Sequence, residues 1–104
     1  MITLDFKRGD TFLLQAVGTV DDVGQDMTNW SVAAQVRNGS SLLHNLTLTW
    51  VDRPNGIYQL SCAPVNTATW PVKLLVCDIQ YTTASGQVIS TETFGINNIA
   101  DVTQ

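Results

Sequence analysis

Hydrophobic and polar residues alternate along this chain with a period of two, in short runs separated by turn residues. In the first run Ile2, Leu4 and Phe6 share one face, and Thr3 and Asp5 share the other. Alternation of this kind predicts β-strands with one face toward a core. The predicted strands cover residues 2–6, 11–20, 30–37, 42–51, 57–62, 73–81 and 88–96. No window has the apolar stripe of a helix.

The predicted strands are separated by residues that favour turns. Glycine and asparagine tolerate positive φ, and proline fixes φ near the value that many turns need. The turn segments are residues 7–10, 38–39, 53–56 and 84–87. Residues 21–26 are polar and predict a loop, and Gly18 predicts a bulge in the run before it. Asn66 or Thr67 is expected to cap a single helical turn that Pro71 stops.

About seven strands in a chain of 104 residues indicate an all-β, immunoglobulin-like antiparallel β-sandwich. The length fits one domain, which we place at residues 1–98, with a polar C-terminal tail at 99–104. Residues 73–81 are apolar on nearly both faces, so this strand is expected in the centre of its sheet. The runs 2–6 and 88–96 are the expected edges.

Composition narrows the classes of partner. The chain is 44% hydrophobic, only 13% charged and carries a net charge of −4, so its field repels phosphate and no nucleic-acid partner is expected. No apolar run approaches the roughly 20 residues of a membrane-spanning helix, and the start of the chain lacks the pattern of a secretory signal. The expected partners are therefore other proteins.

The side chains that carry chemistry are few and scattered. His44 is single and is expected to lie at the surface or at a strand edge. Cys62 and Cys77 fall on the inward faces of their strands, which favours buried, reduced thiols over a disulfide or a nucleophile. The acidic cluster in 21–26 lacks the spacing of a calcium loop. We predict a protein that is not an enzyme and has no cofactor and no metal.

Asp78 is the one carboxylate in the middle of a predicted strand. A buried, unpaired carboxylate would cost too much free energy. It is therefore expected either to face an aqueous rim or to pair with a cation, and the candidates are Arg37, Arg53 and Lys73. Its role is expected to be structural or interfacial.

The three tryptophans are the largest side chains of the chain. Trp50 falls on the inward face of its strand, while Trp30 and Trp70 flank loops. Each of these two either plugs an end of the sandwich or anchors a partner. Together with Thr3 and Ser90 on the expected edge strands, Trp30 and Trp70 are the candidate partner-binding residues.

A series of short motifs follows in a characteristic order. The motifs are residues 6–12 (FKRGDTF), 26–32 (DMTNWSV), 34–37 (AQVR), 55–58 (NGIY), 69–71 (TWP), 77–81 (CDIQY) and 86–93 (GQVISTET). Their order and spacing resemble the immunoglobulin-like domains of tailed-phage virion proteins. The chain is similar to the N-terminal domain of phage baseplate upper proteins and to related short stand-alone tail proteins.

The resemblance implies a non-enzymatic structural protein of the virion, assembled in the host cytoplasm and present in many copies or as a homo-oligomer. It implies a tail, baseplate or fibre adaptor that docks on larger virion proteins. Two alternatives stay open, which are a decoration protein of the capsid and a carbohydrate-binding module for attachment to the host surface. The family offers no catalytic residues to carry over.

Overall fold

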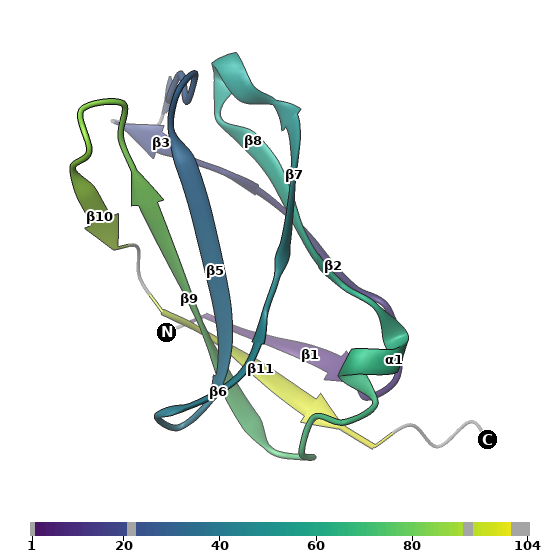
Figure 1. The fold of residues 1–104 in the computed structure, drawn as a ribbon. Helices are drawn as coiled ribbons and strands as arrows, with labels where there is room; N and C mark the ends of the chain where they lie inside the picture. The colour runs from purple at the N-terminus through teal and green to yellow at the C-terminus, as the bar shows by residue number, and fades with distance from the viewer. Residues whose placement is uncertain (1, 21–22, 91–92, 101–104) are drawn as a thin grey trace.

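The computed structural model describes residues 2–20, 23–90 and 93–100, which form two β-sheets packed face to face (Figure 1). The larger sheet contains β1 (Thr3–Lys7), β5 (Ser31–Asn38), β6 (Ser41–Asn45), β9 (Leu74–Thr82), β10 (Val88–Ser90) and β11 (Phe94–Ile99). The smaller sheet contains β2 (Phe12–Val17), β7 (Thr47–Asp52) and β8 (Ile57–Cys62). The remaining elements are β3 (Thr19–Val20), β4 (Val23–Gly24), the 3₁₀ turn η1 (Arg53–Asn55) and α1 (Pro64–Thr67).

The order of strands identifies the type of sandwich. The larger sheet has the order β1-β11-β9-β5-β6, with β10 also paired to β9, and the smaller sheet has the order β2-β8-β7. The order β11-β9-β5-β6 is the G-F-C-C′ arrangement of an immunoglobulin-like domain, with β1 added beside the G strand, and β2-β8-β7 is its B-E-D arrangement. The predicted all-β, immunoglobulin-like fold is thus confirmed. The described strand pairs are antiparallel, as predicted, except for β1 and β11, which pair in parallel.

The core fills the space between the two inner faces. The larger sheet contributes Val32, Ala34, Val36, Leu75, Cys77, Ile79 and Ile96, and the smaller sheet contributes Phe12, Tyr58, Leu60 and Cys62. These side chains alternate with exposed or half-buried ones along each strand, as the period of two predicts. The central position predicted for residues 73–81 is confirmed, because β9 lies between β11 and β5.

The single strand predicted at 42–51 is two strands in different sheets. β6 pairs with β5 in the larger sheet, and β7 pairs with β8 in the smaller one. The chain crosses between them at Leu46, whose side chain is buried and whose amide donates to the carbonyl of Ala34. Leu46 falls on an apolar position of the alternating pattern, so the pattern continues without interruption across the crossing. The crossing therefore could not be predicted from the pattern.

The last predicted strand is also divided. β10 pairs with β9 over its whole length, Val88–Ser90, and β11 pairs with β9 further along. β11 is covered on its other side by β1, so only β10 keeps the edge position predicted for 88–96. The edge position predicted for the first strand is confirmed. β11 extends to Ile99, one residue into the predicted tail, whose residues 101–104 lie outside the described residues.

The predicted strand 11–20 ends early at Gly18. β2 ends at Val17, and the two residues of β3 form a separate small hairpin with β4. β4 lies in the segment predicted as a loop, and Asp21 and Asp22 lie outside the described residues. Gly18 donates its amide to Gly56 and accepts the amide of Gln25, so the chain leaves the sheet there instead of forming the predicted bulge.

The predicted turns are confirmed, and Gly56 explains why one of them needs glycine. Its φ is 72°, and a Cβ at this position would lie 2.6 Å from the carbonyl oxygen of Gln25 and 2.8 Å from that of Gly18. Both neighbours are backbone atoms, which cannot move aside cheaply. The turn after η1 is therefore restricted to glycine by conformation and by space.

The helical turn begins earlier than expected. Pro64 occupies the first turn of α1, and Ala63 stands at the N-cap without a side-chain hydrogen bond, so neither Asn66 nor Thr67 is the predicted cap. Thr67 is buried inside the turn, where its hydroxyl donates to the carbonyl of Asp10 at 2.7 Å. This bond joins α1 to the turn between β1 and β2.

Candidate interaction surface

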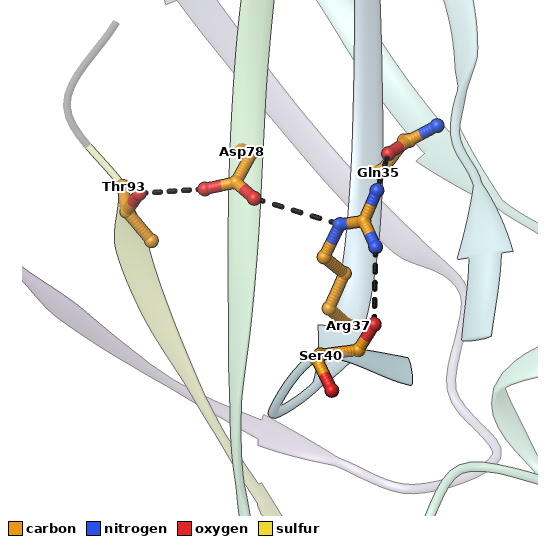
Figure 2. A network of polar contacts seen from close by, with 5 residues as sticks. All are labelled: Gln35, Arg37, Ser40, Asp78 and Thr93. Atoms are coloured by element: carbon orange, nitrogen blue, oxygen red, sulfur yellow. Dashed lines mark hydrogen bonds and ion pairs between the residues drawn. The ribbon is translucent and has the colours of Figure 1, made fainter. Parts of the chain in front are cut away.

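A network of polar side chains lies on the outer face of the larger sheet. The Arg37 guanidinium on β5 lies beside Asp78 on β9, with its Nε 3.6 Å from Oδ2 of the carboxylate (Figure 2). The Thr93 hydroxyl donates to Oδ1 of Asp78 at 2.6 Å. Arg37 also donates to the side chain of Gln35 and to the carbonyl of Ser40. One of the two alternatives for Asp78, a pair with Arg37, is thereby confirmed.

The network follows from the register of the strands. Gln35 is directly opposite Asp78, and Arg37 is two residues further along β5, on the same face. On the side of β9 that faces away from β5, Thr93 lies directly before β11. This position places the Thr93 hydroxyl within hydrogen-bonding distance of the Asp78 carboxylate. The side chains of Arg37 and Asp78 are 32% and 48% exposed, so water weakens their attraction.

A shallow hollow of about 300 Å³ lies over this network. Besides Gln35, Arg37 and Asp78, its lining includes Gln80 and Ser90. Amide, hydroxyl, carboxylate and guanidinium groups therefore face the same space. Such a surface offers both donors and acceptors to another polar surface, as the rim of a protein interface does.

A second hollow of about 230 Å³ lies beside the first and contains two of the predicted partner-binding residues. Trp30 and Ser90 both line it, together with Met27, Tyr81 and Ile89. Ser90 also lines the polar hollow, so the two spaces meet at β10. Trp30 is half-buried, with its ring 6.3 Å from that of Tyr81. The lining is mainly apolar and aromatic.

Below this hollow two tyrosines link the sheets. The hydroxyls of Tyr58 on β8 and Tyr81 on β9 lie 2.8 Å apart. Burial raises the pKa of Tyr58 far above its usual range, and the hydrogen bond with Tyr81 adds to this rise. The Tyr58 phenol therefore stays neutral at physiological pH, and its hydrogen bond with Tyr81 acts as a structural connection between the sheets.

The other two predicted partner-binding residues lie elsewhere. Trp70 is 1% exposed and packs against the rings of Phe6 and Phe12, so it plugs the end of the sandwich next to α1. It has no surface to offer a partner. Thr3 is exposed on β1, opposite Gly95 of β11. The structure thus brings Trp30 and Ser90 together and separates Thr3 and Trp70 from them.

Trp50 is on the predicted inward face but is only half-buried. Its ring packs edge-on against Tyr58, and the Arg53 guanidinium covers it with Cζ 4.5 Å from the ring centroid. Arg53 also donates to the carbonyls of Met27 and Trp30. Arg53 therefore holds the loop that positions Trp30.

In the part of the chain that the structure describes, the titratable side chains do not gather into a chemical centre. Cys62 and Cys77 are free and buried, as predicted, and burial raises the pKa of both thiols, that of Cys77 to about 12. His44 is half-buried on β6, opposite Val36. The Thr28 hydroxyl and amide lower the pKa of Asp26 by hydrogen bonding to it. Within the described residues no three His, Cys, Asp or Glu side chains lie close enough to hold a metal ion.

Only part of this surface could be predicted from the sequence. The alternation places Gln35 and Arg37 on one face of their strand and Asp78 on the outer face of another, and this signal could have joined them. The contribution of Thr93 depends on the break between β10 and β11, and the hold of Arg53 on the Trp30 loop depends on contacts between distant segments. Neither leaves a local pattern.

Similarity to known proteins is found among solved structures. No family model and no curated protein matches the sequence. Among solved structures, murine CRIg is similar with a TM-score of 0.44 and 10% identity, over 92% of this chain and 91% of that chain. The strand order described above, and not this likeness, establishes the immunoglobulin-like arrangement. Within the described residues no helix is long and apolar enough to cross a membrane.

Proposed function

We propose that this chain is a non-enzymatic structural protein of a bacteriophage particle, which docks on larger proteins of the tail, baseplate or fibre. The single observation that carries the proposal is the ordered series of motifs that resembles virion immunoglobulin-like domains. The sandwich built from these motifs has free strand edges and a weakly charged outer face, and both are suited to contacts with other proteins.

The edges supply backbone groups for docking. The Gly95 amide donates to the carbonyl of Ile2, and the Arg8 amide donates to the carbonyl of Ile99. Backbone groups alternate sides along a strand, so the amides of Thr3 and Lys7 point away from β11. On β10, the bond from Thr83 to Gln87 places the Ser90 amide away from β9 by the same reasoning. A partner strand can pair with either edge.

Two proline variants test this mode of docking. Thr3→Pro and Ser90→Pro each remove an amide that faces outward, so the ladders inside the domain keep their bonds. Binding to purified tails is expected to fall for the edge that docks, while thermal unfolding stays near that of the wild type. Thr3→Ala and Ser90→Ala are the matched controls, because they change the side chain and keep the amide. Equal binding by all four variants would exclude both edges.

Quantitative mass spectrometry of purified particles tests the structural assignment itself. The protein is expected in a fixed number of copies per particle. Its absence from particles, while infected cells contain it freely, would contradict the proposal. Salt at about 0.5 M screens interactions between exposed charges that are more than a few ångströms apart. Binding is expected to persist at this concentration, because only 13% of the residues are charged. Antibody labelling then separates a tail adaptor from a capsid decoration protein.

A carbohydrate-binding module is the second candidate, and the hollow beside Trp30 favours it. Trp30 and Tyr81 line that space, and aromatic rings stack on the apolar faces of sugars. Retention of the protein on host polysaccharide, and loss of that retention in Trp30→Ala, would support this candidate. Binding to purified tails by Trp30→Ala at the level of the wild type would show that docking does not use this hollow.

A further inference from the structure

The outer edge of β2 lacks the features that usually protect a strand edge. In the described residues β2 pairs with β8 on one side only. Its sequence, FLLQAV, contains no charge, no proline and no glycine. By contrast β1 carries Asp5 and Lys7, β10 has three residues, and the pairings of the edge strands β6 and β7 each contain a register shift. Edges without such protection readily pair with another strand.

The hydrogen-bonding groups on this edge can be assigned from one contact. The Gly18 amide donates to the carbonyl of Gly56, which is the next pair in the register of β2 with β8. Because these groups alternate along a strand, the backbone groups of Leu13, Gln15 and Val17 point away from β8. The side chains of the same three residues lie on the solvent face, where Leu13 is 62% and Val17 is 50% exposed.

We propose that β2 pairs with β2 of a second copy of this chain, in antiparallel orientation about a two-fold axis at Gln15. In this register Gln15 faces Gln15 of the second copy, and Leu13 faces Val17 of the second copy. All outward backbone groups of the three residues are then paired. The smaller sheets join into one, in the order β7-β8-β2-β2-β8-β7. This inference does not depend on the proposed function.

The strand itself selects a second copy as its occupant. A two-fold interface requires a surface that complements itself, and the series Leu13, Gln15, Val17 is nearly symmetric about its centre. Cross-strand pairs of apolar side chains stabilise such a ladder, and the neutral Gln15 avoids repulsion on the axis. A single strand edge is smaller than a standard interface of roughly 1,200 Å² or more, so the dimer is expected to dissociate on dilution.

Charge reversal at the axis tests the register. Gln15→Lys and Gln15→Glu each place like charges opposite each other in the homodimer, so each variant alone is expected to be monomeric by analytical ultracentrifugation. An equimolar mixture is expected to restore the dimer, because Lys then faces Glu. Thr49→Lys is the matched control: Thr49 is exposed in the same cross-strand row, on β7 at the far edge, and this variant should dimerise like the wild type.

Three results would overturn the proposal: a wild type that stays monomeric at its highest soluble concentration, a Gln15→Lys variant that dimerises like the wild type, or a mixture that fails to pair. Far-ultraviolet circular dichroism checks that each variant is folded. Gln15→Cys gives an independent measurement, because paired Cα atoms about 5.5 Å apart permit a disulfide. Oxidation should give a covalent dimer for Gln15→Cys and none for Thr49→Cys, and absence of the Gln15→Cys dimer would also refute the pairing.

Discussion

The hydroxyl oxygens of Tyr58 and Tyr81 lie 2.8 Å apart, and this hydrogen bond joins the two sheets of the sandwich. Tyr58 comes from β8 and is buried, whereas Tyr81 comes from β9 and is half-buried beside Trp30. Their rings meet edge to face with centroids 6.1 Å apart. The pair therefore couples the core to the hollow in which Trp30 and Ser90 lie.

Removal of both hydroxyls is expected to cost less than the two single removals added together. Tyr81→Phe leaves the buried hydroxyl of Tyr58 without its partner, which is expected to lower the free energy of unfolding by about 1–3 kcal/mol. The double variant Tyr58→Phe/Tyr81→Phe leaves no unpaired hydroxyl, so its loss should be smaller than the sum of the single losses. Urea unfolding of the three variants measures the coupling. Strictly additive losses would show that the hydroxyls do not interact.

Stability is expected to fall at alkaline pH because of a buried thiol. Burial raises the pKa of Cys77 from an ordinary 9.0 to about 12, and the charge of Asp78 adds to the rise. Above pH 9 the unfolded chain loses this proton while the folded chain keeps it, so folding stability is full below that pH and decreases as pH rises toward 12. Urea unfolding at several pH values between 9 and 10 measures the slope.

The Cys77→Ala variant tests whether Cys77 causes this decrease of stability with pH. It removes one of the two buried thiols, so its stability should fall less steeply between pH 9 and 10 than that of the wild type. Cys62 remains in this variant and keeps part of the slope, since burial raises its pKa as well. A Cys77→Ala variant with the full slope of the wild type would mean that the Cys77 thiol ionises normally in the folded protein.

Trp70 is expected to be the costliest tryptophan to truncate. It is buried against Phe6 and Phe12, so Trp70→Ala leaves a cavity under α1 and should lower the free energy of unfolding by about 3–5 kcal/mol. Trp30→Ala removes a half-buried side chain and should cost less. Thermal and urea unfolding compare the two. An equal loss for both would contradict the assignment of Trp70 as the plug of this end.

The sequence predicts the strands better than their partners. Alternation is a local property, so the inward faces of β5, β8 and β9 follow from it directly. The crossing at Leu46 and the parallel pairing of β1 with β11 have no local signal, because they depend on which distant strands meet. These features could not be predicted from one sequence by its period alone.

The candidate surface shows the same division. Asp78 needs a cation nearby, and the sequence limits the choice to three, but only the register of β5 with β9 selects Arg37. Thr93 completes the network through the interruption between β10 and β11, which the sequence analysis treats as one strand. Trp30 and Ser90 are 60 residues apart in the sequence. They line the same hollow because β10 lies beside the loop before β5.

Arg53 is expected to be irreplaceable by lysine. Its guanidinium lies over Trp50 and donates from two nitrogens to the carbonyls of Met27 and Trp30, a geometry that a lysine ammonium cannot reproduce. Arg53→Lys should therefore lower stability by roughly 1–3 kcal/mol, nearly as much as Arg53→Met. Trp fluorescence should report a looser Trp30 in both variants. Full stability in Arg53→Lys would show that charge alone suffices there.

The network around Asp78 is expected to contribute little to folding. Arg37 and Asp78 are partly exposed and 3.6 Å apart, and exposed ion pairs of this kind contribute about 0–1 kcal/mol. Arg37→Gln, Asp78→Asn and the double variant form a cycle whose coupling free energy should fall in that range and decrease with salt. Thr93→Val is the control that removes the uncharged partner of Asp78 and keeps the ion pair.

The size of that coupling separates two roles for this face of the sheet. A coupling near 2 kcal/mol or more, unaffected by salt, would mean that the network stabilises the sandwich as a buried pair does. A small coupling leaves the outer side chains of β5 and β9 free to serve contacts with a partner. In that case binding of the Asp78→Asn variant to purified tails is the informative measurement, because a loss of binding with unchanged unfolding would assign this face to the interface.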